Sequence, residues 1–376
     1  FSGIRVLKSF VRENHSGRQF AEASANYRKK SLDLVKVDSL FTPLISLLVG
    51  FSTLLVVYIG SKEVMAGEIT VGNITEFIMY VFMLTWPVTA LGWTSSQIQR
   101  AAASQKRINE FLQAHSELEI GQQISKPISG NWEFKNVSFT YPGSDREILK
   151  QITFEIKSGE SVALLGTTGS GKSSLAQLMA RFYDPSSGDL LLDGVSLKDW
   201  DIKHVRKALA YVPQDVFLFS TTIAENISFG QDGMPTEQIM QAAKMADVYE
   251  NIMEFPGQFE TILGERGVTL SGGQKQRVSI ARALAKNPSM LILDDCLSAV
   301  DTHTEHKILN NLKKIMVGKT SLIISHRVSS AKLANRIMVL QDGQIVETGN
   351  HVQLMKRKGY YYELYQNQLN EEENGL

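Results

Sequence analysis

The sequence predicts an α/β domain preceded by an all-helical segment, and three observations support this fold class. An apolar run at 162–165, typical of a buried strand, leads into the glycine-rich stretch 166–173 and then into residues 174–179, which favour a helix. A second apolar run, 291–294, ends in an aspartate. Far upstream, residues 40–59 contain no charged side chain.

Length and composition set the first limits. A chain of 376 residues has room for roughly two or three domains. The 39 Lys and Arg residues balance 39 Asp and Glu residues, so net charge indicates no nucleic-acid partner. The single cysteine, Cys296, excludes an internal disulfide framework and is typical of a reducing compartment. Because the chain starts at Phe1 in the middle of a pattern, with neither an initiator Met nor a signal peptide, we expect a fragment of a longer protein.

Two stretches before residue 115 are apolar enough to cross a membrane. Residues 40–59 reach the roughly 20 apolar residues that a bilayer core requires. The second stretch runs from about Ile69 to Trp93, with Glu76 as its only charge. Each contains a proline, Pro43 or Pro87, which membrane helices tolerate.

Charges flanking these stretches predict their orientation. The loop between them holds Lys62, Glu63 and Glu68, and both outer flanks are basic: Arg18, Arg28, Lys29, Lys30 and Lys36 before, and Arg100, Lys106 and Arg107 after. The positive-inside rule puts the flanks in the cytoplasm and the loop outside. The alternative is a pair of buried helices in a soluble protein, and the length of the uncharged run counts against it. Two helices alone expose apolar faces and need partners.

The stretch Gly166–Ser173 has the pattern of a phosphate-binding loop, with four variable residues between Gly166 and the Gly-Lys-Ser end. Glycines let backbone N–H groups curl around a phosphate, and the helix that follows adds the positive end of its dipole. Lys172 can then reach the β- and γ-phosphates, and Ser173 can ligate Mg²⁺. A turn that binds nothing is disfavoured because every fixed position is filled.

Two downstream segments are candidates for binding the same ligand as this loop. Asp294 ends an apolar strand, where a carboxylate opposite a phosphate loop suits Mg²⁺ coordination. The pentapeptide 270–274, Leu-Ser-Gly-Gly-Gln, precedes a helical stretch at 276–286. Ser271 fits an N-cap, so this helix start is a second candidate anion site. Taken alone, it is equally well an ordinary capped helix.

Weaker patterns complete the outline. Alternating residues at 132–139 and the run 152–156 predict two strands. Residues 116–130 are polar and interrupted by proline, which predicts a linker. Residues 3–10 predict a short amphipathic helix.

Taken in order, these elements resemble the ATP-binding cassette (ABC) family over residues 131–376. The resemblance is carried by the phosphate loop, Gln214, the pentapeptide 270–274, the Asp294 strand, Ser298 to Asp301, and His326 after the strand 320–325. It implies an α/β P-loop nucleotide-binding cassette with a RecA-like core, an antiparallel β subdomain and an α-helical signature subdomain. It also implies a head-to-tail dimer of cassettes with two ATP molecules between them.

The resemblance assigns roles to matching residues. Tyr141 would stack on adenine. The phosphates would be held by Gly166, Thr167, Thr168, Gly169, Ser170, Gly171, Lys172, Ser173 and Ser174. Mg²⁺ would be held by Ser173, Gln214 and Asp294. The γ-phosphate of ATP on the partner cassette would meet the signature residues Ser271, Gly272, Gly273 and Gln274. His326 would sense the γ-phosphate, Asp301 would communicate across the dimer, and 264–267 resembles a stretch that touches coupling helices.

Residues 1–115 then resemble the end of an exporter-type transmembrane domain. Residues 3–10 would be the second coupling helix, which docks on the partner's cassette, followed by the fifth and sixth membrane helices. The first four membrane helices would be missing from this chain. We therefore expect a membrane segment at 1–115, a linker at 116–130 and a nucleotide-binding domain at 131–376.

One position departs from the family. The residue after Asp294 is usually a glutamate that polarises the attacking water, and here it is Asp295. A carboxylate withdrawn by ~1 Å can lose on the order of 10²-fold in rate. We favour a heterodimer in which this site is slow and a partner supplies the glutamate. The other reading is a homodimer that hydrolyses ATP with Asp295 or through His326.

Together these observations predict an ATPase that drives export of a drug, lipid or peptide across a membrane. We expect a multi-pass protein of the cell (inner) membrane with its cassette in the cytoplasm, a second half-transporter as partner, ATP and Mg²⁺ as cofactors, and no nucleic acid. One rival is a soluble ABC ATPase acting on DNA or the ribosome, against which the uncharged run counts. Another is a regulatory or degenerate half of a heterodimer, slow at this site.

Two smaller features have ordinary explanations. Cys296 is expected to be a packing residue beside the Asp294 strand rather than a reactive thiol. The tail, with its basic and aromatic run 356–365 and acidic end 371–373, is expected to be a surface helix with a frayed terminus.

Overall fold

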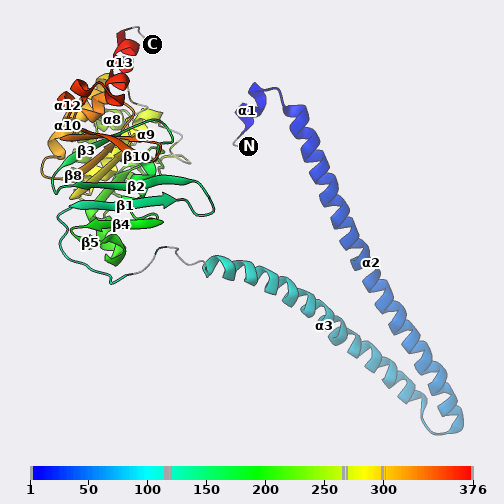
Figure 1. Cartoon of the computed structure of the whole chain (residues 1–376). Helices are drawn as coiled ribbons and strands as arrows, with labels where there is room; N and C mark the ends of the chain where they lie inside the picture. The colour runs from blue at the N-terminus through cyan, green and yellow to red at the C-terminus, as the bar shows by residue number, and fades with distance from the viewer. Residues whose placement is uncertain are drawn as a thin grey trace. The chain divides into compact units, whose positions relative to one another are not determined.

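The computed structural model describes residues 3–113, 118, 121–264, 267, 270–297, 300 and 302–373. The chain divides into two compact units, Phe1–His115 and Ser116–Leu376, and each is described by itself (Figure 1).

The first unit consists of α1 (Ile4–Ser9), α2 (Glu13–Ala66) and α3 (Val71–Leu112). The two long helices contain the apolar stretches predicted from the sequence, with Pro43 inside α2 and Pro87 inside α3. The helix that contains the second stretch begins at Val71, since Thr70 is the N-cap of α3 and its backbone N–H donates to Asn73 Oδ1 at 3.0 Å. Near the turn, a side chain on Gly60 would come within 2.8 Å of Ile74, so a residue without a side chain lets the helices approach closely.

The apolar windows of α2 and α3 are long enough to cross a bilayer, and none of their residues is buried within the described chain. Exposed leucine, phenylalanine and tryptophan side chains follow both helices, for example Leu47, Phe82 and Trp86. Such a surface requires a lipid or protein environment.

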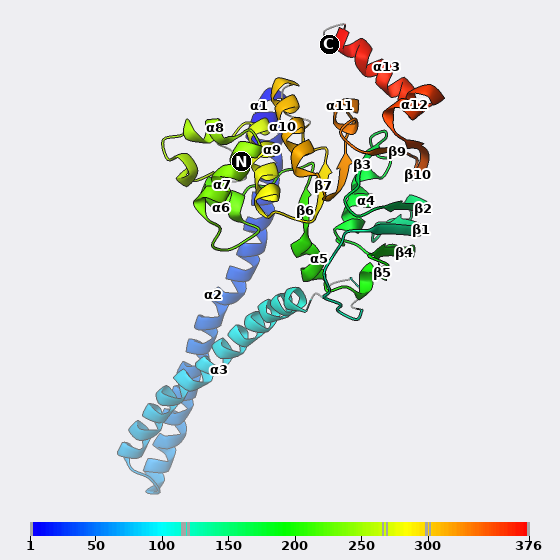
Figure 2. The same cartoon turned by 90° about the vertical axis from the view of Figure 1, so that its left-hand side faces the viewer.

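The second unit contains two sheets (Figure 2). The antiparallel sheet has the order β2-β1-β4-β5, with β1 at Trp132–Thr140, β2 at Glu147–Ile156, β4 at Ser187–Leu192 and β5 at Val195–Ser196. The six-stranded sheet has the order β10-β9-β3-β8-β7-β6, with β3 at Ser161–Leu165, β6 at Leu209–Val212, β7 at Met290–Asp294, β8 at Thr320–Ile324, β9 at Arg336–Gln341 and β10 at Gln344–Gly349. Its pairings are parallel except that of β9 with β10.

Helices cover the sheets and form a separate bundle. The helices are α4 (Lys172–Met179), α5 (Ile202–Ala208), α6 (Ile223–Ser228), α7 (Thr236–Met245), α8 (Tyr249–Met253), α9 (Gly272–Ala285), α10 (Thr302–Ile315), α11 (Val328–Ala331), α12 (His351–Arg357) and α13 (Tyr360–Glu373), with short 3-10 turns at Leu197–Asp199 and Gln258–Glu260. In Figure 2, α6 to α9 lie beyond the β6–β7 side of the large sheet, away from the antiparallel sheet.

Alternation along the central strands explains the layers. Val162 and Leu164 of β3 pack in one cluster with Phe134 of β1 and Leu175 of α4. Ala163 and Leu165 face the other way, into a cluster with Tyr361 of α13. Because successive strand side chains point to opposite faces, a continuous apolar run is what a sheet buried on both faces requires.

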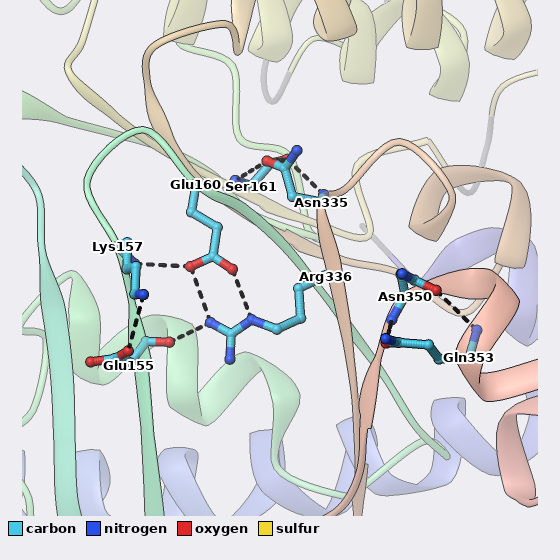
Figure 3. Close-up of polar contacts among 8 residues, drawn as sticks. All are labelled: Glu155, Lys157, Glu160, Ser161, Asn335, Arg336, Asn350 and Gln353. Carbon is cyan, nitrogen blue, oxygen red and sulfur yellow. Dashed lines mark hydrogen bonds and ion pairs between the residues drawn. The ribbon is translucent and has the colours of Figure 1, made fainter. Parts of the chain in front are cut away.

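Polar contacts fix the start of β3 beside β9. Arg336 donates to Glu160 through Nε at 2.8 Å and through a terminal nitrogen at 3.1 Å, as Figure 3 shows. The Ser161 hydroxyl and N–H both donate to Asn335 Oδ1, at 2.7 and 2.9 Å. The same view shows the reciprocal cap of α12, in which Gln353 N–H donates to Asn350 Oδ1 at 2.9 Å.

Two local expectations needed correction, the start of β2 and the tail. β2 begins at Glu147, earlier than the predicted start at 152, because the hairpin with β1 continues to Thr140. At the end of the predicted linker, the Ser129 N–H donates to the Asp193 carboxylate at 2.7 Å, and the Asn131 N–H at the start of the cassette donates to it at 2.8 Å. The tail is two helices, separated at Lys358 with φ +53°, and its Tyr361 is fully buried instead of lying on a surface helix.

Candidate functional site

The phosphate loop joins β3 to α4 through three glycines with positive φ. Gly166 has φ +155°, and a Cβ there would lie 2.1 Å from the Leu340 carbonyl oxygen. Gly169 has φ +81° and opens into free space, whereas Gly171, with φ +104°, is the N-cap of α4. Residues with a side chain rarely adopt this conformation, so the glycine spacing fixes the curl of the loop.

Lys172 lies inside this curl. Its side chain is buried, and Nζ donates to the carbonyl oxygens of Gly166 at 2.9 Å and Thr167 at 2.8 Å. Burial lowers the pKa of the ammonium, while the carboxylates of Asp295 and Asp294 act in the opposite direction. The site therefore holds a cation whose charge is poorly solvated and available to an anion.

Strand order brings the other candidates to the same edge. β8 lies between β3 and β7, so the segment after β8, with His326, lies between the loop after β3 and the carboxylates at the end of β7. Ligands in open parallel sheets bind beyond the carboxyl ends of the strands. This edge is therefore where a bound group would meet Lys172, His326 and the two aspartates.

Both oxygens of the buried Asp294 carboxylate accept hydrogen bonds. Ser173 Oγ donates to Oδ1 at 3.0 Å, and Tyr211 OH donates to Oδ2 at 3.1 Å. Burial raises the pKa of Asp294, and the two hydroxyl donors partly offset this. The sequence analysis missed Tyr211, which lies on β6 next to β7.

Asp295 and His326 lie at the same edge of the sheet as Lys172 and Asp294. Asp295 has φ +43°, and its N–H donates to the Ile324 carbonyl at 2.8 Å, so its backbone is fixed to β8. Burial and the charge of Lys172 lower the pKa of His326, whereas the aspartates and a hydrogen bond with the Gly166 backbone raise it. The net effect favours the neutral imidazole near pH 7, whose ring nitrogens can then donate and accept.

These residues surround a cavity of about 340 Å³, a size that suits a small-molecule ligand. Its lining comprises Tyr141, Arg146, Ile148, Thr168, Gly169, Gly171, Lys172, Ser173, Ser174, Gln214, Asp294, Asp295, Ile324 and His326. Arg146, Ile148 and Ile324 were not predicted. Gly166, Thr167 and Ser170, which were predicted, shape the loop without lining the cavity, and the buried Ser170 Oγ has no hydrogen-bond partner in the described structure.

Tyr141 stands at the cavity wall with its hydroxyl already bonded. It lies 2.8 Å from Ser174 Oγ and donates to Gln177 Oε1 at 2.9 Å. Its ring meets Phe139 and Tyr183 edge-on, with centroids 4.8 and 5.3 Å apart. The ring is held by α4 and by the antiparallel sheet, which leaves it part-exposed at the cavity.

The signature residues lie apart from this cavity, on the first turn of α9. Ser271 Oγ accepts from the Gln274 N–H at 3.3 Å, and Gln274 Oε1 accepts from the Ser271 N–H at 3.0 Å. Ser271 and Gly272 are exposed, and Gly273 is half-buried. Ser298, Ala299, Asp301, Glu265 and Arg266 lie outside the described residues.

The donor set fits a magnesium–nucleotide complex. An ammonium, a glycine-rich loop and the N-terminus of α4 suit a polyphosphate. The oxygens of Ser173, Asp294 and Gln214 are the hard ligands that Mg²⁺ prefers. Among the described residues no cluster of three or more His, Cys, Asp or Glu could hold a metal by itself.

Comparison with known proteins decides the family. The model of the ABC transporter domain matches residues 149–298, and that of the ABC transporter transmembrane region matches residues 1–88. The chain belongs to the ABC transporter family. A solved bacterial Atm1-family ABC exporter with ATP bound superposes with a TM-score of 0.90 and 33% identity, covering 97% of this chain and 65% of that one.

Curated ABC transporters are similar over almost the whole chain. The probable multidrug resistance ABC transporter ATP-binding/permease protein YheI of Bacillus subtilis is 39% identical over 98% of this chain and 63% of its own length. The ATP-dependent lipid A-core flippase of Aromatoleum aromaticum is 40% identical over 98% of this chain and 61% of its own length. The chain thus spans less than two thirds of the length of these relatives. The predicted fold class is confirmed, and the match at 1–88 makes this ABC transporter chain a membrane protein.

Proposed function

We propose that this chain binds Mg²⁺-ATP in the cavity beside Lys172, and that a pair of such cassettes uses ATP binding and hydrolysis to drive export across a membrane. One observation carries the proposal: Lys172 and the carboxylates of Asp294 and Asp295 line the same cavity, beyond the carboxyl ends of β3 and β7, two parallel strands that flank β8. A phosphate loop and a carboxylate pair separated by one strand suit a metal-bound triphosphate.

Each residue then has a distinct task. Lys172 and the loop amides bind the phosphates, and Tyr141 takes the adenine ring. Ser173, Gln214 and Asp294 would hold Mg²⁺, which neutralises charge on the phosphates when bound. Asp295 accepts a proton from the attacking water, and the neutral His326 contacts the γ-phosphate. Water attacks phosphorus, and the bond to the ADP oxygen breaks.

The signature residues are proposed to act on a second cassette. Ser271 to Gln274 are separate from their own chain's cavity and form a capped helix start, which is suited to an anion. Closing a dimer would bring this helix start against ATP held by the partner. Opening after hydrolysis would release the products.

An exposed aromatic cluster on the cassette supports coupling to the membrane helices. Phe219 and Phe229 stack with centroids 4.4 Å apart, beneath Arg282 at 5.7 Å from each ring. Phe217 and Phe229 are 51% and 61% exposed. We propose that this cluster receives the coupling helix α1 of a second chain, whose Ile4, Val6 and Phe10 are exposed.

The proposed setting is the cell (inner) membrane, with several spans and a cytoplasmic cassette. Multidrug and lipid transporters both occur among the relatives, so drug, lipid and peptide cargoes all stay candidates. The second candidate function is a regulatory or degenerate half of a heterodimer, which the aspartate at position 295 favours.

The test is ATPase activity of the whole protein in nanodiscs, alone and with a candidate partner chain. Activity that disappears in Lys172→Ala supports the exporter, and ATP-dependent accumulation of a lipid or drug probe in inverted vesicles tests transport. Nucleotide binding with turnover only in the presence of a partner supports the degenerate half. Absence of nucleotide binding contradicts both.

A further inference from the structure

The segment that carries His326 connects β8 to α11, and one side chain from another helix holds its backbone. Gln368, on α13, donates a hydrogen bond from Nε2 to the His326 carbonyl oxygen at 2.6 Å. Its Oε1 accepts a hydrogen bond from the Val328 N–H at 2.8 Å. A carboxamide presents one donor group and one acceptor. The reversed amide would set oxygen against oxygen and N–H against N–H, so these contacts fix the orientation of the amide.

The helix that brings Gln368 to this place is itself anchored. Tyr361, Tyr365 and Gln368 lie on one face of α13, since they are spaced by four and three residues. Tyr361 is fully buried in the cluster that contains Leu165, the last residue of β3. Lys332 Nζ donates to Tyr365 OH at 3.3 Å and lies 4.3 Å from the centre of its ring. The layer that supports the phosphate-loop strand therefore also sets the position of Gln368.

A second helix holds the other end of the segment. Glu305 of α10 is 3% exposed and accepts hydrogen bonds from Ser329 Oγ at 3.0 Å and from the Arg327 guanidinium. The Arg327 N–H also donates to Ser325 Oγ at 2.9 Å. Gln368 and Glu305 thus hold the backbone on both sides of the His326 side chain, whose ring makes its own hydrogen bond with the Gly166 backbone.

We infer that Gln368 is a positioning residue for His326, and that α13 thereby controls how well the imidazole meets the γ-phosphate. The inference rests on the proposed function, in which His326 senses that phosphate. Misplacing a catalytic group by about 1 Å can lower a rate by about 10²-fold. Loss of the contacts to the His326 carbonyl and the Val328 N–H, with Glu305 still in place, permits a smaller shift, so Gln368→Ala is expected to lower kcat about tenfold.

The first experiment is a double-mutant cycle in the whole protein in nanodiscs, with Gln368→Ala, His326→Ala and both together. Gln368→Ala should lower kcat while leaving KM for ATP nearly unchanged, and it should have no further effect once His326 is alanine. The control is Gln366→Ala, which removes the same amide from another face of α13 and should keep wild-type kcat. An unchanged kcat in Gln368→Ala, or an equal fold loss in the His326→Ala background, overturns the inference.

The second experiment does not need turnover. Hydrogen–deuterium exchange of a peptide covering 325–331 should be faster in Gln368→Ala than in wild type and Gln366→Ala, because the Val328 N–H loses its acceptor. Unchanged exchange overturns the inference whether or not the protein hydrolyses ATP. If wild type itself shows no ATPase activity, the proposed function fails, and the exchange result still decides whether Gln368 holds the segment.

Discussion

Ser173 Oγ donates a hydrogen bond of 3.0 Å to Asp294 Oδ1, which ties the first turn of α4 to the end of β7 across the width of β8. The other carboxylate oxygen of Asp294 is held by Tyr211. Two hydroxyl donors thus orient one buried carboxylate before any metal is bound. Metal ligands are commonly held in this way by neighbouring hydrogen-bond donors.

Replacing Tyr211 by phenylalanine should weaken the effect of Mg²⁺ on nucleotide binding. A hydrogen bond to a charged group contributes about 1.5–3 kcal/mol. Without it, Ser173 is the one hydroxyl donor left to orient the Asp294 carboxylate, and the pKa of Asp294 rises further. We expect a roughly tenfold higher Mg²⁺ concentration for half-maximal binding of a fluorescent ATP analogue. Tyr249→Phe, in a helix outside the cavity lining, is the control, and equal Mg²⁺ dependence in both variants would argue against a role for Tyr211.

Replacing Lys172 by alanine should remove nucleotide binding at this site. The substitution deletes the buried cation of the loop and leaves the carbonyl groups of Gly166 and Thr167 without their donor. Loss of a charge-assisted contact of about 1.5–3 kcal/mol corresponds to at least a tenfold weaker affinity. Lys150→Ala, an exposed lysine on β2, is the matched control. Titration with a fluorescent ATP analogue measures both, and retained affinity in Lys172→Ala would refute the phosphate-loop assignment.

Much of this cassette follows from short local patterns. In the first pattern, an apolar run is followed by the glycine-rich loop Gly166–Ser173, which suits a phosphate. In the second, an apolar run ends at Asp294, whose carboxylate suits Mg²⁺. Such strands can be predicted from a short apolar run, because a strand that is buried on both faces has apolar residues at nearly every position. The pairing of Lys172 with the aspartates could also be anticipated, since the carboxyl ends of parallel strands share an edge.

Other parts depend on contacts between distant segments. Tyr211 reads as an ordinary apolar strand residue, and only the adjacency of β6 and β7 brings its hydroxyl to Asp294. Arg146 reaches the cavity because the hairpin of β1 and β2 lies over the loop, which no local pattern encodes. The aromatic tail likewise looked solvent-exposed, yet Tyr361 is buried, because helical spacing places one tyrosine inward.

Replacing Asp295 by glutamate should increase ATPase turnover. The backbone of Asp295 is fixed by its bond to the Ile324 carbonyl, so an added methylene moves the carboxylate further into the cavity. If the shorter side chain costs on the order of 10²-fold, turnover should rise by tenfold or more. Steady-state ATPase assays in nanodiscs measure the change, with Asp295→Asn as the inactive counterpart. Unchanged turnover with intact ATP binding would show that residue 295 is not the limiting base.

Cys296 should be unreactive in the folded protein. Its side chain is buried behind the Asp294 strand, and burial, reinforced by the charge of Asp295, raises the thiol pKa to about 12. The thiolate is the reactive form, so iodoacetamide at about pH 8 should label native protein slowly and urea-unfolded protein quickly. Because this is the single cysteine of the chain, labelling per chain reports it directly by mass spectrometry.

The same pKa predicts how stability changes at alkaline pH. Between the ordinary thiol pKa near 9 and the folded value of about 12, the unfolded chain has released the proton while the folded chain retains it. The folded state then binds more protons, so this group makes the free energy of unfolding fall as pH rises through that window. Cys296→Ala lacks the group, and its melting temperature should fall less than that of wild type between about pH 8 and about pH 10. If the melting temperatures of the two proteins fall equally over this pH range, or if iodoacetamide labels the native protein rapidly, the thiol is not buried and protonated.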